Sequence, residues 1–235
     1  MGRLAEKIAV VVGAGQTPGA TIGNGRATAI RFAEEGANVL LVDKDAESVA
    51  ETLQMIEERG GAGSTFVADI TEEAQCKSIT EACLDRYGRM DVLHNNVGIG
   101  EGDSGPTSIT EEIWDRIFHV NLKSVMFTCK YALPVMRKRG AGSIINISSI
   151  AAVCEIGMVS YKASKAALNA YTHSLATGGA KYGIRANVIM PGLMNTPMAI
   201  EGNVAAGHER EALIQRRNAS VPLGGQMGSA WDVAN

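Results

Sequence analysis

Tyr161 and Lys165 are the side chains whose types and spacing first suggest catalysis. They lie four residues apart in YKASK, so on a helix they share one face. A free tyrosine titrates near ~10, and a nearby cation favours its phenolate form. Lowering that pKa by two or three units needs about 3–4 kcal/mol, which requires a partly enclosed pocket. The pair predicts a tyrosine acid or base near neutral pH, although such a pair is also common on solvated helix surfaces.

The glycine-rich stretch GAGQTPGATIGNG (residues 13–25) is a second candidate for chemistry. Glycines let the backbone turn tightly and approach a pyrophosphate, and the amides that open the next helix hold its negative charge. Asp43 follows a later apolar run and could accept hydrogen bonds from the adenosine ribose while repelling a 2′-phosphate. This favours NAD over NADP. The neighbouring Lys44 could reach a phosphate, which keeps NADP open.

The elements that must position these residues alternate between short apolar runs and helical patterns. Strands are predicted at Ile8–Val12, Asn38–Val42, Ser64–Val67, Asp91–Asn95, Ser143–Ile147 and Arg185–Ile189. Helices are predicted at Arg26–Glu35, Ala46–Arg59, Glu72–Tyr87, Glu111–Arg139 and Tyr161–Tyr182. Repeated βα units with right-handed crossovers predict an α/β fold with a doubly wound parallel sheet, the three-layer α/β/α Rossmann architecture. We expect one domain over residues 1–235.

Composition narrows the function classes. The 235 residues are 46% hydrophobic and 20% charged, with a net charge of −3, so no broad basic field for nucleic acid is present. The four cysteines form no CxxC pair, which indicates reduced thiols in a cytoplasmic protein. No run reaches the roughly 18 apolar residues of a membrane span. The four histidines have no metal-site spacing, so no metal is predicted, and His94 is interpreted as a satisfied core residue.

Further motifs follow the predicted strands in a recognisable order. VADIT contains Asp69 and Ile70, NNVG spans Asn95 to Gly98, HVNLKS contains Asn121, and NISS ends at Ser149. Pro191, Gly192 and Thr196 follow the last strand. Together with the glycine turn and YKASK, these motifs resemble those of the short-chain dehydrogenase/reductase superfamily over nearly the whole chain.

The resemblance implies hydride transfer between a nicotinamide cofactor and a small-molecule secondary alcohol or ketone. Tyr161 would move the hydroxyl proton, Ser149 would orient the substrate oxygen, and Asn121 would support a proton relay. Lys165 would lower the tyrosine pKa and bind the nicotinamide ribose. The residues that would bind the cofactor are Gly13, Thr17, Gly23, Asn24, Gly25, Asp43, Lys44, Asp69, Ile70, Asn95, Val97, Gly98, Tyr161, Lys165, Pro191, Gly192 and Thr196. We expect a homodimer or homotetramer.

Two departures from the family pattern concern the site. The first and second glycines are usually four residues apart, and here Gly13 and Gly23 are ten apart. The inserted residues could form a lip over the adenosine ribose or pyrophosphate through Thr17, Pro18 and Thr21, or project into solvent. The catalytic serine is also ambiguous: strand register favours Ser149, and the family's usual distance to the tyrosine favours Ser148.

The end of the chain is a third departure. Ser229 to Asp232 resembles a capping box that opens a helix, and the strand that follows in the family is absent. HEREALIQRR (residues 208–217) could form an amphipathic lid helix, and Glu155 could recognise a substrate hydroxyl or amine. Two alternative functions remain open: an NADP-linked ketone reductase and a non-catalytic nucleotide-binding scaffold.

Overall fold

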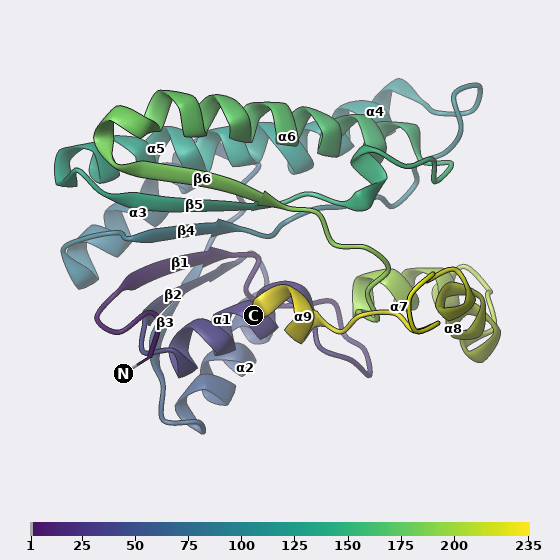
Figure 1. The fold of residues 1–235 in the computed structure, drawn as a ribbon, viewed down its shortest axis with the longest axis horizontal. Helices are drawn as coiled ribbons and strands as arrows, with labels where there is room; N and C mark the ends of the chain where they lie inside the picture. The colour runs from purple at the N-terminus through teal and green to yellow at the C-terminus, as the bar shows by residue number, and fades with distance from the viewer. Residues whose placement is uncertain (1) are drawn as a thin grey trace.

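The computed structural model of the chain describes residues 2–235. Within them lies a six-stranded sheet in the order β3-β2-β1-β4-β5-β6, and every neighbouring pair is parallel (Figure 1). The strands are β1 (Ile8–Val12), β2 (Asn38–Asp43), β3 (Ala62–Val67), β4 (Val92–Asn95), β5 (Gly142–Ile147) and β6 (Ile184–Ile189). The predicted doubly wound α/β fold is confirmed.

The helices also follow the prediction, with one difference. The connections between strands contain α1 (Asn24–Glu34), α2 (Ala46–Glu57), α3 (Glu73–Tyr87), α4 (Glu111–Phe118), α5 (Ser124–Arg139) and α6 (Val159–Gly179). The single helix predicted over residues 111–139 is interrupted, because a π-helical turn over His119–Lys123 joins α4 to α5. Such turns widen a helix locally and occur often at functional sites.

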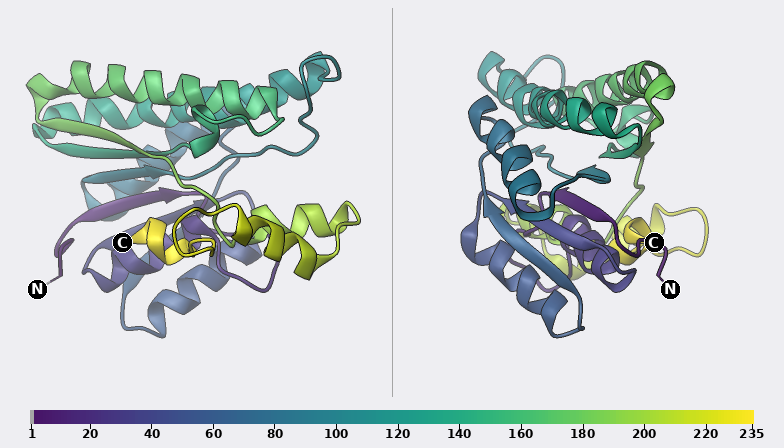
Figure 2. Two further views of the ribbon diagram at one scale, coloured as in Figure 1. Left: turned by 45° about the vertical axis from the view of Figure 1, so that its right-hand side comes forward. Right: turned by 90° about the vertical axis from the view of Figure 1, so that its left-hand side faces the viewer.

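Helices cover both faces of the sheet, with α3, α5 and α6 on one side and α1 and α2 on the other (Figures 1 and 2). Successive strand residues point to opposite faces. In β1, Val10 and Val12 pack in the core beneath α3, α5 and α6, whereas Ala9 and Val11 pack against α1 and α2. Both faces are therefore buried, which explains why the strands are continuous apolar runs.

Three helices follow β6: α7 (Pro197–Ala205), α8 (Arg210–Ala219) and α9 (Ala230–Ala234). The first two lie beyond the carboxyl ends of the strands (Figure 1), and an ion pair between Glu201 and Arg210 joins them. The helix predicted in residues 208–217 is thus observed as α8.

The short α9 packs on α1 through Ala27, Ala230 and Ala234. The predicted capping box is present: the Asp232 carboxylate accepts hydrogen bonds from the Ser229 amide (2.7 Å) and hydroxyl (2.8 Å). Within residues 2–235 the sheet has no strand after β6. None of the helices described there is both long and apolar enough to cross a membrane.

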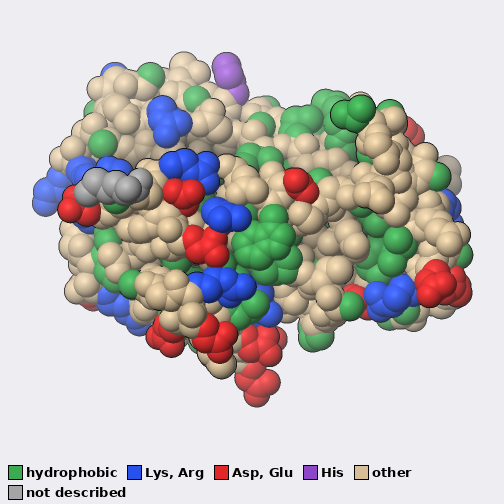
Figure 3. Space-filling view, turned by 60° about the horizontal axis from the view of Figure 1, so that its bottom comes forward, with side chains coloured by type: hydrophobic (Ala, Val, Ile, Leu, Met, Phe, Trp, Pro, Cys, Tyr) green, Lys and Arg blue, Asp and Glu red, His purple; other side chains and the backbone are tan. Residues whose placement is uncertain are grey.

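Charges of both signs alternate on the face formed by α1 and α2 (Figure 3). Glu34 pairs there with Arg31 (2.7 Å) and Arg59 (3.5 Å). Partly exposed pairs of this kind contribute at most about 1 kcal/mol each. The positive and negative side chains on this face therefore neutralise one another locally, and the residues described there create no extended electrostatic potential of one sign.

Candidate active site

The strand order places a crevice at the carboxyl edge of the sheet, between β1 and β4. The chain proceeds from β1 toward β3 on one side and from β4 toward β6 on the other, and ligands of doubly wound sheets bind at this switch point. Gly13, Asp43, Gly98 and Ser149 all follow or end strands at this edge. The topology therefore gathers candidate residues that are far apart in the sequence.

The glycine turn brings the start of α1 against the end of β1. Gly13 has a φ of +80°, and a Cβ on Gly25 would collide with the Gly13 carbonyl oxygen, so both positions require glycine. Helix α1 begins at Asn24, directly after its N-cap Gly23. The Asn24 Oδ1 atom is buried and has no hydrogen-bond partner. The backbone forms a cradle at the positive end of a helix, which fits a cofactor pyrophosphate.

The inserted residues are fixed mainly by side chains of the β2–α2 segment. The Asp43 carboxylate accepts from the Gly15 amide (2.9 Å), and the Ser48 hydroxyl accepts from the Gln16 amide (2.8 Å). The Gln16 side chain accepts in turn from the Gly23 amide (2.8 Å). The loop is therefore tied to the segment that carries the predicted ribose ligand Asp43.

The tip of the insertion extends toward α7 (Figure 1). A Cβ added to Gly19 would lie 2.7 Å from Glu201 Oε1 and 3.0 Å from Pro197 Cβ, so the loop backbone rests against this helix. Thr17 and Pro18 are exposed, and Thr21 is half-buried. The insertion therefore contacts α7 and does not only project into solvent.

The second predicted carboxylate, Asp69, follows β3. It accepts hydrogen bonds from the Thr71 amide (2.9 Å) and hydroxyl (2.7 Å), and these bonds hold the pKa of Asp69 below its usual range. Ile70 is buried, and Lys44 is exposed after β2. Asp69 is therefore a fixed carboxylate beside the adenosine end of the crevice.

The side chain of Asn95, a predicted cofactor ligand, is buried in the core. Its side chain donates to Asn146 Oδ1 (2.9 Å) and accepts from the Thr128 hydroxyl (2.9 Å). Asn95 is the last residue of the buried strand β4, and its side chain connects β5 and α5 through these bonds. The next residue, Asn96, donates to the Gly13 carbonyl (3.3 Å) and braces the glycine turn.

Val97 and Gly98, two further predicted cofactor ligands, follow β4 and approach the glycine turn and Lys165, respectively. A Cβ on Gly13 would approach Val97 Cγ2 to 2.8 Å. A Cβ on Gly98 would lie 2.8 Å from Lys165 Nζ and 3.6 Å from Asn121 Oδ1. A side chain at position 98 would therefore displace the Lys165 ammonium from its present place.

Tyr161 and Lys165 share one face of α6, as their spacing predicts. Lys165 is buried, its Nζ lies 5.7 Å from the centre of the Tyr161 ring, and it donates to the Ile147 carbonyl (2.8 Å). Burial lowers the pKa of Lys165 to about 8. The helix therefore holds a buried cation beside a partly exposed tyrosine.

The effect on Tyr161 differs from the prediction. Burial raises the pKa of Tyr161, and a hydrogen bond with the Ser149 side chain lowers it by less. The net lowering expected from Lys165 is not found, because burial of the phenol dominates. In this geometry Tyr161 is held as the protonated phenol.

The two candidate serines have different surroundings. Ser148 is buried, and its hydroxyl donates to the Lys165 carbonyl (3.1 Å), which places it in the packing between β5 and α6. The Ser149 side chain lies close enough to Tyr161 to lower the pKa of the phenol, and its hydroxyl accepts from the Ala151 amide (3.1 Å). The surroundings of Ser149 therefore suit the predicted role better than those of Ser148.

Asn121 lies in the π-helical turn and is fully buried. Its Oδ1 accepts from the Ile99 amide (2.8 Å), and its Nδ2 donates to the Ile99 carbonyl (2.9 Å) and the Ser164 hydroxyl (3.1 Å). Ser164 donates in turn to the Tyr161 carbonyl (2.8 Å). The asparagine side chain thus joins the β4 loop to the catalytic helix.

The segment after β6 lies at the far end of the crevice. The Pro191 carbonyl accepts from the Ile150 amide (3.0 Å), and Thr196 is a buried N-cap of α7. No atom lies within 4 Å of a Cβ built on Gly192. The backbone after Pro191 therefore leaves room at the end where a nicotinamide carboxamide would lie.

Glu155, the predicted substrate contact, lies exposed in the loop before α6. Its carboxylate accepts from Lys162 Nζ (3.0 Å) and the Gly157 amide (2.8 Å), and these bonds lower its pKa. Cys154 is exposed. These hydrogen bonds of Glu155 therefore stabilise the conformation of its own loop.

Sequence reasoning missed several residues that shape the site, including Gln16, Ser48 and Asp103. Gln16 accepts from the Gly23 amide, Ser48 donates to the Gln16 carbonyl, and Asp103 accepts from the Tyr161 amide. The last two pairs join residues that are 32 and 58 positions apart in the sequence. Neither residue type nor spacing carries a signal for such contacts. His94 is buried as predicted, with its pKa lowered by burial to about 4, but its Nδ1 has no hydrogen-bond partner.

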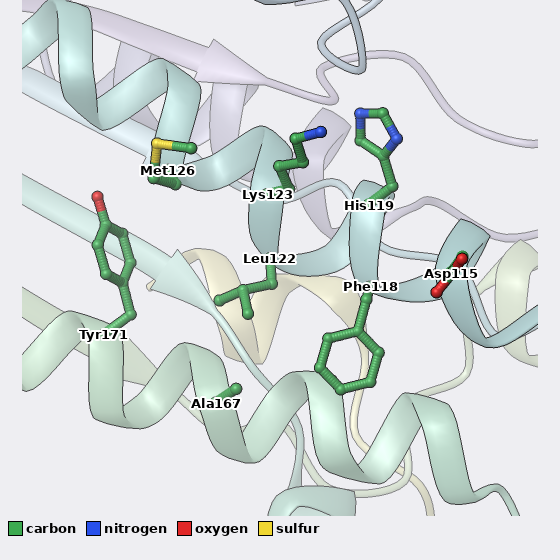
Figure 4. Close-up of a pocket in the computed structure, with 8 residues that line it drawn as sticks. All are labelled: Asp115, Phe118, His119, Leu122, Lys123, Met126, Ala167 and Tyr171. Carbon is green, nitrogen blue, oxygen red and sulfur yellow. The ribbon is translucent and has the colours of Figure 1, made fainter.

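A groove of about 590 Å³ lies outside this crevice, between the α4–α5 segment and α6 (Figure 4). Its lining residues are Asp115, Phe118, His119, Leu122, Lys123, Met126, Ala167 and Tyr171. Neither Tyr161 nor Lys165 lines it, so this hollow is separate from the candidate chemistry. Residues 2–235 contain no group of three metal-binding side chains.

Comparisons with known proteins agree with this arrangement. The family model for short chain dehydrogenase matches residues 7–205. The chain is 34% identical over 233 residues to the 3-oxoacyl-[acyl-carrier-protein] reductase FabG of Thermotoga maritima, covering 99% of this chain and 89% of the relative. These matches span almost the whole sequence.

Solved structures agree in fold as well. A short-chain dehydrogenase/reductase from Burkholderia xenovorans has a TM-score of 0.95 and 38% identity, covering 100% of this chain and 89% of that one. An NAD⁺-bound xylitol dehydrogenase has a TM-score of 0.88 and 27% identity, covering 99% and 90%. The chain belongs to the short-chain dehydrogenase family and is an oxidoreductase acting on CH–OH groups.

Proposed function

We propose that the protein transfers a hydride between NAD(H) and a secondary alcohol or ketone. The observation that carries this proposal is the meeting of Tyr161, Ser149, Lys165 and Asn121 at one end of the crevice that begins with the glycine turn. A cofactor held along the crevice would supply or accept the hydride. The protein's own groups hold the substrate oxygen and move its proton.

In the reducing direction, Tyr161 donates its phenolic proton to the carbonyl oxygen, which suits a phenol whose burial keeps it protonated. Ser149 donates a hydrogen bond to the same oxygen and steadies the charge that develops there. The buried Lys165 ammonium stabilises negative charge left on the phenol and binds the nicotinamide ribose. Asn121 fixes the β4 loop through Ile99 and supports the proton path.

The preference for NAD rests on Asp43. Its carboxylate ends β2 and bonds the Gly15 amide, so it faces the space beside the glycine turn where an adenosine ribose would lie. A carboxylate there accepts from ribose hydroxyls and repels a 2′-phosphate. We place Gly13, Gly23, Asn24 and Gly25 around the pyrophosphate, and Gly98, Pro191, Gly192 and Thr196 toward the nicotinamide.

A titration with NADH and NADPH, followed by nicotinamide fluorescence, tests the cofactor assignment, and a screen of secondary alcohols with NAD⁺ tests the reaction. Stronger binding of NADH and turnover of at least one alcohol are expected. Stronger binding of NADPH would favour the NADP-linked reductase, for which Lys44 is available. Binding without turnover would favour the scaffold. The homodimeric or homotetrameric assembly and the cytoplasmic location of the protein remain predictions from the sequence.

A further inference from the structure

Asp103 lies in the β4–α4 connection, 58 residues before the catalytic tyrosine. Its carboxylate accepts hydrogen bonds from the Tyr161 amide (2.6 Å) and the Ser160 amide (3.2 Å), and it also accepts from the Ser104 amide (2.8 Å). Neither the family match nor the motifs in the sequence assign a role to this residue. It is the acidic side chain that meets the backbone of Tyr161.

The start of α6 needs such a partner. The first amides of a helix have no acceptor within the helix, and the N-cap Met158 provides no side-chain hydrogen bond. The Ser104 carbonyl accepts from the Val159 amide (3.2 Å), and Asp103 accepts from the next two amides. One loop therefore bonds three successive amides of the helix that carries the catalytic residues.

The same loop also touches the tyrosine ring. A Cβ on Gly100 would lie 3.3 Å from Tyr161 Cδ2, so the loop backbone packs against the ring itself. Gly102 has a φ of +80°, and a turn from the Asp103 amide to the Gly100 carbonyl (3.2 Å) shapes this segment. The loop thus contacts both the backbone and the side chain of Tyr161.

We propose that Asp103 is a positioning residue for Tyr161: it holds the first turn of α6 so that the phenol stays in register with Ser149 and the substrate oxygen. This inference rests on the proposed function for its catalytic consequence. A misplacement of about 1 Å can lower a catalytic rate by about 100-fold. An acceptor contributed by a distant loop therefore sets the rate as well as helix stability.

The test compares Asp103→Ala with Asp103→Asn, which keeps one acceptor oxygen, and with Thr110→Ala. Thr110 is the matched control, because its hydroxyl caps α4 through the Ile113 amide (3.3 Å) in the same connection. Turnover is measured with NAD⁺ and cyclohexanol or isopropanol. Hydrogen exchange is measured at the amides of residues 159–161, together with NADH affinity.

We expect Asp103→Ala to lose about 10- to 100-fold in kcat with KM and NADH affinity nearly unchanged, and Asp103→Asn to recover part of this loss. Exchange at residues 159–161 should accelerate in Asp103→Ala and not in Thr110→Ala. Equal kcat in Asp103→Ala and Thr110→Ala, or a loss that appears mainly in KM, would overturn the proposal.

The two proposals fail in different ways. If the wild-type chain oxidises no secondary alcohol, the proposed function fails, and exchange still decides whether Asp103 holds Tyr161. Unchanged exchange in a folded Asp103→Ala would reject the positioning role. If the wild type is active, the positioning role is supported when Asp103→Ala lowers kcat and rejected when the loss appears mainly in KM.

Discussion

The two ends of the crevice are built in different ways. At the catalytic end, Tyr161 and Lys165 lie on one long helix, and the lysine is buried against the sheet. At the adenosine end, the lengthened glycine loop has exposed residues and is held by Asp43 and Ser48 from another connection. A helix fixes the relation between side chains by its own geometry, whereas a loop depends on contacts from elsewhere.

The largest effect should arise at the catalytic end. Tyr161→Phe removes the phenolic proton donor, so we expect turnover to fall by about 10²- to 10⁴-fold while NADH still binds. Tyr171→Phe is the matched control, because Tyr171 is on the same helix and lines the separate groove (Figure 4). Retained turnover in Tyr161→Phe would contradict the proposed acid.

The second prediction concerns the charge at this end. The pKa of Lys165 is lowered to about 8 by burial, so between that pH and ~10.4 the unfolded chain binds more protons than the folded one. The free energy of unfolding should therefore rise with pH in this window, and the gain should be absent in Lys165→Met. Below the window the buried ammonium costs stability.

Urea unfolding at about pH 7.5 and 9.5 measures this effect, and the comparison with the variant removes the contribution of other groups. The difference between wild type and Lys165→Met should shift by roughly 2 kcal/mol in favour of the wild type as the pH rises. A difference independent of pH would mean that Lys165 is solvated in solution.

At the adenosine end, Asp43→Ala removes a charged acceptor. We expect NADH to bind about ten- to hundredfold more weakly, which corresponds to about 1.5–3 kcal/mol, and NADPH to be affected less. Asp43→Asn keeps an acceptor for Gly15 and removes the repulsion of a 2′-phosphate. Asp45→Ala is a control for loss of a nearby carboxylate, since Asp45 caps α2 through the Ser48 amide. An equal loss for both cofactors in Asp43→Asn would refute discrimination by charge.

The smallest effect is expected from the insertion. Removing residues 16–21 deletes the Gln16 contacts and the approach to Glu201, and we expect NADH affinity to fall by up to about tenfold. A milder variant, Gln16→Ala, removes only the bond to the Gly23 amide. If the variant with the shortened loop binds NADH as tightly as the wild type, the lip hypothesis is rejected. The adenosine end would then differ from the catalytic end only in its greater exposure to solvent.

The sequence alone determined the strands, their alternation with helices and the face shared by Tyr161 and Lys165. Continuous apolar runs indicate strands buried on both faces, and the spacing of Tyr161 and Lys165 specifies one helix face. The glycines at positions 13 and 25 indicate that the backbone after β1 passes close to the start of α1. These features are local, so periodicity and residue type were sufficient to predict them.

Tertiary structure decided what depends on contacts between distant segments. It buried the Asn95 side chain against Asn146, brought the Ser149 side chain near the Tyr161 phenol, and brought Asp103 to the start of α6. It also buried the Tyr161 phenol, which raises its pKa, and gave the Lys165 ammonium a carbonyl partner. A hydrogen-bond partner and a degree of burial are properties of the folded surroundings, and no residue's own type or spacing specifies them.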